Sequence, residues 1–157
     1  MHRFLTMKTG WALALFAGLD IICVGLGMGV PFFCILLGFP VGWYLARKSV
    51  SSSGLDEKAL TFIFKGSLIT AVITLVLMLA VWSRAIFMVF DPAADLANYG
   101  IPLILFEPRA SFLGWLGLMI FIAPFLQFLM TLFGAQLTAL RLLSKSKKDN
   151  HAIPDYT

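Results

Sequence analysis

The stretch "LTFIFKGSLITAVITLVLMLAVW", from Leu60 to Trp82, is apolar along almost its whole length and contains one charged residue, Lys65. A helix of this length measures roughly 35 Å, against about 30 Å for the hydrocarbon core of a bilayer. Its β-branched residues do not argue against a helix, because backbone groups in lipid must form their hydrogen bonds within the segment. We therefore predict a membrane-spanning helix here.

The composition of the whole chain indicates the same class of protein. Of 157 residues, 60% are hydrophobic and 13% are charged, whereas about 25% of the residues of a soluble domain are charged. The apolar residues lie in long runs, and the basic residues follow the ends of those runs, as is typical of residues that contact lipid headgroups. We predict an all-α integral membrane protein that binds no nucleic acid.

The apolar run from Gly10 to Ala46 is too long for one span, because as a single helix it would measure roughly 55 Å. The sequence "GLGMGVP", from Gly25 to Pro31, interrupts this run with three glycines and a proline. These residue types favour a turn. We predict two helices joined by a short hairpin, at about residues 5–24 and 32–47.

The loop between the third and fourth predicted spans, Arg84–Ser111, is called the outer loop. It is apolar but broken by prolines, which favours a short helix in place of a span. Asp91 suits an N-cap, Pro92 suits the first helical position, and Gly100 suits the position after a helix. We predict a short interfacial helix at about residues 92–99, with its apolar side chains against lipid or the bundle.

The fourth predicted span covers residues 110–143, which is longer than a bilayer requires, and Pro124 is expected to kink it. With the third span at residues 60–82, residues 1–143 would form a four-span transmembrane helical bundle. Residues 144–157 would form a basic cytoplasmic tail, whose lysines suit anionic lipid headgroups.

The positions of lysine and arginine predict the orientation, because these residues concentrate on the cytoplasmic side. Of the 12 basic residues, all but Arg84 and Arg109 fall on one side of the four predicted spans. The members of the larger group are Arg3, Lys8, Arg47, Lys48, Lys58, Lys65, Arg141, Lys145, Lys147 and Lys148. We predict that both termini are cytoplasmic and that the protein lies in the cell (inner) membrane.

Small residues at four-residue spacing indicate where helices approach each other closely. Such residues form a stripe on each of the first two predicted helices: Gly10, Ala14 and Gly18 on the first, and Cys34, Gly38, Gly42 and Ala46 on the second. We predict that the two stripes face each other in a tight hairpin. The alternative is chance, because glycine and alanine are common in membrane helices.

Polar side chains predict the inward faces of the third and fourth helices, because polar atoms in lipid seek partners. The third helix carries Ser67, Thr70, Ala71 and Thr74 on one side, and the fourth carries Gln127, Thr131, Gly134 and Thr138. Both sides are expected to point into the bundle.

Asp20 is the only acidic residue within a predicted span. It lies away from the small-residue stripe of its helix, so we expect it to face the third or fourth helix, with Gln127 and then Arg84 as preferred partners. An acid inside a membrane is costly, and an ion or proton site is one interpretation. Because a transport pathway usually contains several such groups, we favour a hydrogen-bonded residue that fixes helix register.

Other candidate chemistry is limited to the outer-loop acids and two cysteines. Asp91, Asp95 and Glu107 have the chemistry to bind a divalent cation or transfer protons. Local roles in helix capping or pairing explain them better, so no catalytic residue, metal site or cofactor is predicted. Cys23 and Cys34 flank the hairpin, and we favour two free thiols over a disulfide.

Three functions are compatible with this pattern. The favoured one is a non-catalytic membrane subunit or assembly and scaffold factor, within a homo-oligomer or a larger membrane complex. The second is a small ion- or proton-coupled transporter or channel that uses Asp20 and Gln127. The third, less favoured, is a membrane enzyme acting at the outer face. The sequence specifies no substrate.

Overall fold

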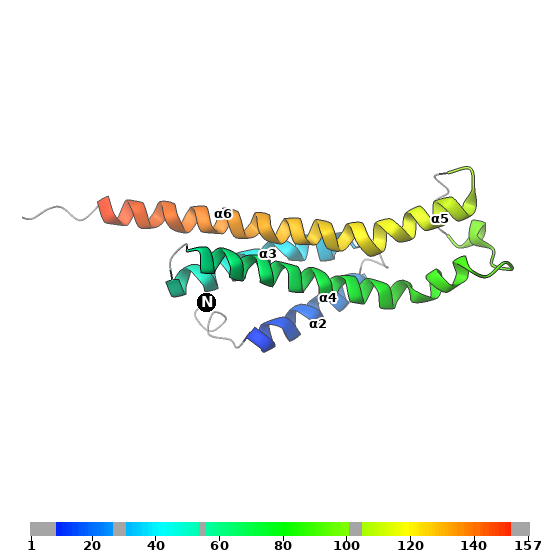
Figure 1. Cartoon of the computed structure of the whole chain (residues 1–157), viewed down its shortest axis with the longest axis horizontal. Helices are drawn as coiled ribbons and strands as arrows, with labels where there is room; N and C mark the ends of the chain where they lie inside the picture. Colours follow the sequence, from blue (N-terminus) through cyan, green and yellow to red (C-terminus); the bar gives the residue numbers. More distant parts are fainter. Residues whose placement is uncertain (1–8, 27–30, 54–55, 101–104, 152–157) are drawn as a thin grey trace, which may run out of the picture.

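A computed structural model of the chain describes residues 9–26, 31–53, 56–100 and 105–151. Within those ranges every regular element is helical. The elements are α2 (Thr9–Leu26), α3 (Phe32–Ser53), α4 (Glu57–Val89), the short 3-10 helix η1 (Leu96–Asn98), α5 (Pro108–Gly117), the π-helical turn η2 (Leu118–Ile122) and α6 (Ala123–His151). Because α5, η2 and α6 follow one another without a break, they form one long rod, and the described chain is an all-helical bundle of four helices (Figure 1).

Two of these helices are long and apolar enough to cross a membrane. They are α4 and the stretch from Pro108 to Ser144, which contains α5, η2 and most of α6. The apolar part of α2, Gly10–Val24, is shorter. By length and composition alone, two such helices are weak evidence of membrane insertion.

The observed helices extend beyond several of the predicted bounds. The second helix continues from the predicted residue 47 to Ser53, and the third covers Glu57–Val89 rather than residues 60–82. Polar residues are compatible with helix, so hydropathy located the apolar centre of each helix better than its ends. The first four residues of the predicted first span, 5–8, lie outside the described residues.

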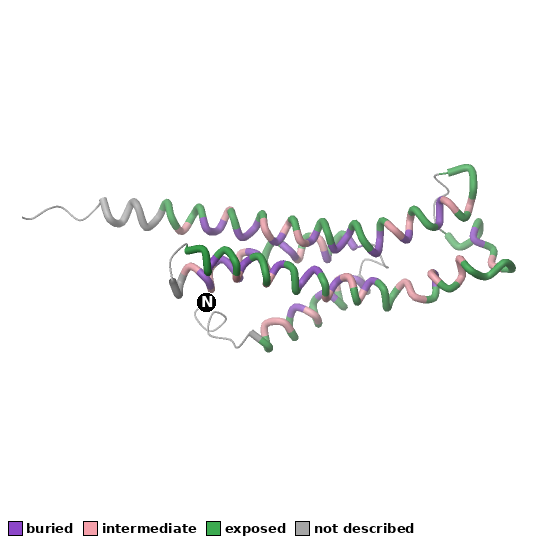
Figure 2. The backbone as a smooth tube through the Cα atoms, in the orientation of Figure 1, coloured by how far each residue is buried: buried purple, intermediate pink, exposed green. Residues whose placement is uncertain are grey.

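The helices α3, α4 and α6 run side by side along the long axis of the molecule, whereas α2 crosses at an angle (Figure 1). The most extensive helix–helix contact joins α3 to α6. Figure 2 shows the buried positions recurring along the inner sides of these helices. On α4 they recur every three or four residues, the spacing of one helix face: Ala59, Ile63, Ser67, Thr70, Ala71, Thr74, Met78 and Ala85.

Glycines bring the backbones of α3 and α6 together. A Cβ atom added at Gly38 would lie 2.6 Å from the carbonyl oxygen of Gln127, and one added at Gly42 would lie 2.7 Å from the amide nitrogen of Ala135. In the opposite direction, a Cβ at Gly134 would lie 2.6 Å from the carbonyl oxygen of Phe39. Any side chain at these three positions would push the helices apart.

The prediction that the first two helices form a tight hairpin through their small residues is wrong. Gly38 and Gly42 of the α3 stripe do mark a close contact, but its partner is α6, whereas Cys34 of the same stripe lies against α2. A Cβ added at Gly10 or Gly18 of α2 would meet no atom within 4 Å, and Ala14 is exposed. Small residues show that a helix can be approached closely, but not by which neighbour.

The irregularity in the fourth helix lies just before Pro124. The π-helical turn Leu118–Ile122 replaces the regular helix there, and α6 resumes at Ala123. A proline cannot donate the backbone hydrogen bond of a regular helix, so a local change in helix type next to it is expected. The sequence therefore located a distortion, which the structure accommodates as a wider turn.

The predicted interfacial α-helix at residues 92–99 is wrong as to type and length. The structure has only the three-residue helix η1, and Asp95 caps it by accepting a hydrogen bond of 3.3 Å from the amide of Asn98. Asp91 accepts a hydrogen bond of 2.9 Å from the amide of Ala93 and so closes a turn. Gly100, expected to follow the longer helix, has a φ of 86°, which favours glycine, and lies just after η1 and its C-cap Tyr99. Residues 101–104, which follow Gly100, lie outside the described residues.

We predict that Gly42→Ala will lower the thermal stability of the purified protein, whereas Gly18→Ala will not. Both substitutions gain roughly 1 kcal/mol of helix propensity. At Gly42 the new methyl group meets backbone atoms of α6, and relieving the overlap should cost about 1–3 kcal/mol. Thermal unfolding of both variants in the same detergent measures the difference.

The Gly18→Ala variant is a matched control, because the same atoms are added on a helix surface with no neighbour within 4 Å. Equal melting temperatures for the two variants would contradict the close α3–α6 contact.

Candidate functional site

The candidate site is the buried acid on α2. Asp20 has 0% of its surface exposed, although it belongs to a helix whose large side chains are mostly exposed. Phe16 and Val24, one turn before and one turn after it, are also buried. These three residues form the narrow face through which α2 contacts the rest of the bundle.

The carboxylate of Asp20 is held by α4. The hydroxyl of Thr74 donates a hydrogen bond of 2.5 Å to Oδ2 of Asp20, and both side chains are fully buried. The oxygen of Thr74 also lies 3.2 Å from the carbonyl oxygen of Thr70, one turn earlier in α4. Because a hydroxyl has one hydrogen, Thr74 cannot donate to both acceptors at once. If the side chain at position 20 donated the hydrogen bond to the Thr74 oxygen, the Thr74 hydroxyl could donate to the carbonyl oxygen of Thr70, and both contacts would be hydrogen bonds.

A third helix closes the site. Cys34 of α3 is fully buried, and its thiol lies 3.9 Å from the backbone carbonyl oxygen of Asp20, as a weak donor. Val24, Cys34 and Met78 form one buried apolar cluster beside the acid. Asp20 therefore lies where α2, α3 and α4 meet, enclosed by side chains from each.

The structure confirms that Asp20 faces the third long helix but contradicts both predicted partners. Gln127 is fully buried on α6, and neither its amide nitrogen nor its amide oxygen has a hydrogen-bond partner in the described part of the chain. Arg84 is exposed near the far end of α4. Thr74 was missed as the partner, although the row of small polar residues at positions 67, 70 and 74 was a signal for it.

The other predicted inward-facing polar residues are buried, but they bond to their own helices. Thr131 donates to the carbonyl oxygen of Gln127 at 2.8 Å, and Thr138 donates to that of Gly134 at 2.8 Å. Ser67 donates to the carbonyl oxygen of Ile63 at 2.8 Å. Such local bonds let hydroxyl groups be buried without a partner on another helix.

Five buried side-chain polar atoms lack a protein partner among the described residues: Oδ1 of Asp20, Nε1 of Trp82, Nε of Arg47 and both terminal atoms of Gln127. A buried polar group without a hydrogen bond costs about 1–3 kcal/mol. The atoms of Asp20 and Gln127 are the structural argument for any role of the site beyond packing.

Two of the three outer-loop acids have local roles. Asp91 closes a turn and Asp95 caps η1, where its Oδ2 also accepts a hydrogen bond of 2.6 Å from the side chain of Asn98. Glu107 is exposed and precedes α5 without capping it through its side chain. In the described ranges, no three histidine, cysteine or acidic residues are grouped so that they could hold a metal ion.

Both cysteines are free thiols in the structure. Cys34 belongs to the α2–α3–α4 junction, and Cys23 is half-buried beside it.

Fold and site together define a class: a helical bundle with two helices that could cross a membrane and a buried acid at the junction of three helices. No protein-family model, no curated protein and no solved structure matches this chain.

We predict that Asp20→Asn will keep the stability of the parent, whereas Asp20→Leu will lower it by about 1–3 kcal/mol. The asparagine amide can donate to Thr74, which then donates to the carbonyl oxygen of Thr70. Leucine leaves the hydroxyl of Thr74 without its interhelical partner and matches the acid poorly in shape. Thermal unfolding in detergent measures both changes.

Thr74→Val tests the same contact from the other helix. In combination with Asp20→Leu it should cost little more than Asp20→Leu alone, because the two residues share one interaction. Additive losses in the double variant would show that Asp20 and Thr74 stabilise the bundle independently.

Proposed function

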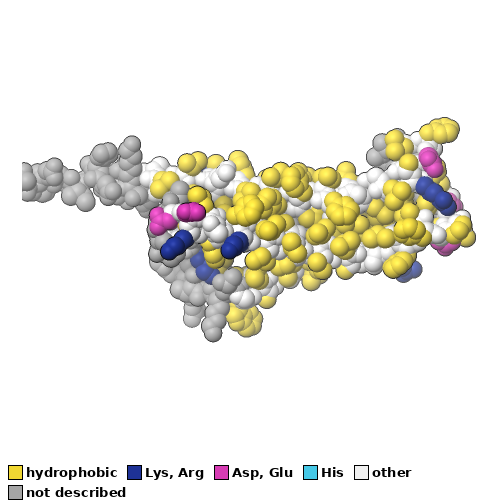
Figure 3. Space-filling model, viewed as in Figure 1, with side chains coloured by type: hydrophobic (Ala, Val, Ile, Leu, Met, Phe, Trp, Pro, Cys, Tyr) yellow, Lys and Arg dark blue, Asp and Glu magenta, His cyan; other side chains and the backbone are white. Residues whose placement is uncertain are grey.

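We propose that this chain is a four-span integral membrane protein with both termini in the cytoplasm, and that it acts as a non-catalytic membrane subunit or assembly factor. The observation that carries the proposal is its apolar belt. Large hydrophobic side chains are exposed on α2, α3, α4 and α6; one example from each helix is Ile21, Phe32, Val76 and Phe125. In Figure 3 the middle of the molecule is largely hydrophobic, and the charged side chains lie towards its two ends.

The packing of the helices supports four spans rather than two. Because α3 runs alongside α4 and α6 and contacts both, it would cross the same thickness of bilayer. The short apolar part of α2 is compatible with a span if the bilayer thins locally or if flanking side chains extend to the interface.

The enclosure of Asp20 supports a role in packing rather than chemistry. The acid has no exposed surface, and it joins α2 to α4 through Thr74. A polar contact of this kind is well suited to fixing how one membrane helix sits against another. Because Asp20 is buried inside the bundle, the surface of the long helices is mainly apolar. Such a surface suits contact with lipid or with another membrane protein.

A second candidate function, a small ion- or proton-coupled transporter, is favoured by one specific observation. Oδ1 of Asp20 and the side-chain amide of Gln127 are buried without a hydrogen-bond partner among the described residues. A pathway through the bundle would use such atoms as transient ligands. A membrane enzyme acting at the outer face has less support, because Asp91, Asp95 and Glu107 are not grouped, among the described residues, so that they could hold a metal ion.

We predict opposite membrane sides for the two polar turns. In a background with Cys23→Ser and Cys34→Ala, a cysteine introduced as Ser52→Cys should be labelled only from the cytoplasm. One introduced as Ala97→Cys should be labelled only from outside. The distribution of lysine and arginine is the physical reason. A membrane-impermeant maleimide, applied to intact cells and to inverted vesicles, measures both, and labelling of both positions from one side would contradict four spans.

We predict that the full-length protein, purified from its native membrane through two successive affinity tags, will retain a membrane-protein partner at fixed stoichiometry. Asp20→Asn should keep this complex, because the helix junction is preserved, and Asp20→Leu should weaken it. In liposomes, the purified parent should give proton and cation flux no greater than that of empty vesicles.

The flux assay separates the two candidate functions. Flux that is clearly above that of empty liposomes and is abolished by Asp20→Asn, in a variant of normal stability, would replace the subunit proposal with the transporter. A protein that purifies alone and gives no flux would contradict both.

A further inference from the structure

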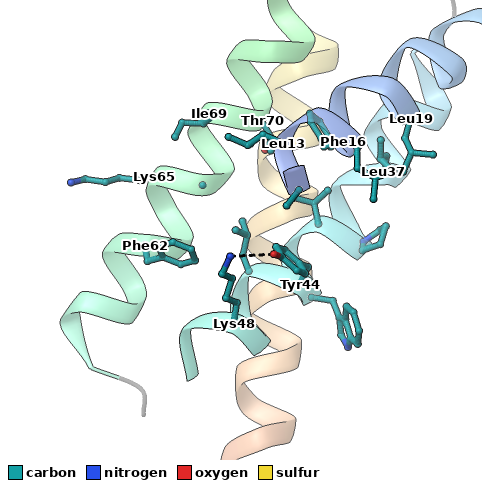
Figure 4. Close-up of a pocket in the computed structure, with 17 residues that line it drawn as sticks. Leu13, Phe16, Leu19, Leu37, Tyr44, Lys48, Phe62, Lys65, Ile69 and Thr70 are labelled. Atoms are coloured by element: carbon teal, nitrogen blue, oxygen red, sulfur yellow. Dashed lines mark hydrogen bonds between the residues drawn. The ribbon is translucent and has the colours of Figure 1, made fainter. Parts of the chain in front are cut away.

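A groove lies between α2, α3 and α4, at the end of the bundle where α2 begins (Figure 4). Its volume is about 430 Å³, within the range of about 300–1,000 Å³ that is usual for small-molecule sites. The walls are almost wholly apolar and include Leu13, Phe16, Leu19, Leu37, Phe62 and Ile69. Leu19 and Ile69 are exposed, so the groove reaches the surface of the bundle.

The groove exists because α2 is held to the bundle at one end only. Its second half is anchored by Asp20 and Val24, whereas its first half diverges from α3 and α4 (Figure 1). The close contact of α3 with α4, where the side chain of Leu45 lies against Gly66, forms the floor of the gap. The opening is therefore a consequence of the helix arrangement.

One end of the groove is cationic. Lys48 of α3 lines it, and its ammonium group lies 3.3 Å from the hydroxyl of Tyr44 and over the Tyr44 ring at 5.5 Å from the centroid (Figure 4). The stem of Lys65 contributes to the wall from α4, and its amine points outward. Among the residues that the structure describes, no acid lines the groove.

We propose that this groove binds one molecule of an anionic phospholipid, with an acyl chain between α2 and α4 and the phosphate at Lys48. The inference rests on the membrane placement in the proposed function, which puts Lys48 at the cytoplasmic leaflet. At that leaflet, the apolar walls of the groove match the hydrocarbon chain of the lipid, and the lysine at its end matches the negatively charged headgroup.

The chemistry of the walls selects a lipid over a peptide. An extended peptide in this groove would bury backbone amides and carbonyls against apolar side chains that offer no hydrogen bonds, which is costly. An acyl chain has no such groups. The ammonium group of Lys48 at the end of the groove favours an anionic headgroup over a zwitterionic one.

The test uses the full-length protein in detergent, incubated with equimolar palmitoyl-oleoyl phosphatidylglycerol and phosphatidylcholine, and native mass spectrometry to count retained lipids. We expect one phosphatidylglycerol molecule to be retained, in preference to phosphatidylcholine by about fivefold, the factor that one lysine contributes near an anionic lipid surface. Lys48→Gln should abolish the preference, and Lys48→Arg should restore it. Lys58→Gln is the matched control, since it removes an exposed lysine outside the groove.

A second pair of variants tests the apolar part. Ala12→Trp places an indole in the groove and should abolish retention of both lipids, whereas Ala80→Trp adds the same ring on an exposed surface of α4 and should not. Melting temperatures of all variants confirm that they fold.

Equal retention of the two lipids by the parent, or unchanged retention in Ala12→Trp, would overturn the proposal. So would a dimer that dissociates in Ala12→Trp, because the occupant would then be a second copy of the chain. Failure here is distinguishable from failure of the proposed function. Retention is measured in detergent and does not depend on orientation or on a protein partner, which the cysteine labelling and the co-purification report separately.

Discussion

The bundle depends on the close approach of two helix backbones. Where α3 crosses α6, Gly38, Gly42 and Gly134 leave no space for a Cβ atom on either side. In lipid there is little hydrophobic force to hold helices together, so dispersion contacts between closely packed backbones become a main source of stability. This contact fixes the pair α3–α6, and α4 then packs against both.

The position of α2 depends on a different kind of interaction. Neither Gly10 nor Gly18 of this helix makes a close contact with a neighbour, and a buried acid joins the helix to α4 through Thr74. One polar contact fixes a crossing point but does not align two helices along their length. The first half of α2 therefore diverges, and the apolar groove with Lys48 at its end follows from that divergence. The acid and the groove are two consequences of one mode of attachment.

This arrangement also bears on the choice between a subunit and a transporter. An acid that serves transport must exchange its ligands with water, whereas Asp20 is enclosed by α2, α3 and α4. The amide of Gln127, which has no partner in the described part of the chain, lies on α6, outside the group of helices that holds Asp20. Transport is favoured only by individual buried atoms of Asp20 and Gln127. A structural role is favoured by the enclosure of Asp20 at the whole α2–α3–α4 junction.

The sequence by itself determined that the chain is helical, where the apolar centre of each helix lies, and which faces of α4 and α6 are buried. These properties follow from hydropathy and from the repeat of the α-helix, both of which are local. Only the tertiary structure decided that Gly38 and Gly42 pack against α6 and not α2, and that Asp20 bonds to Thr74 and not Gln127. A stripe of small residues predicts a closely packed helix, and a lone acid predicts a hydrogen-bonding neighbour. Which of several helices supplies that neighbour depends on crossing angles and relative heights, and these arise only when all the helices pack at once.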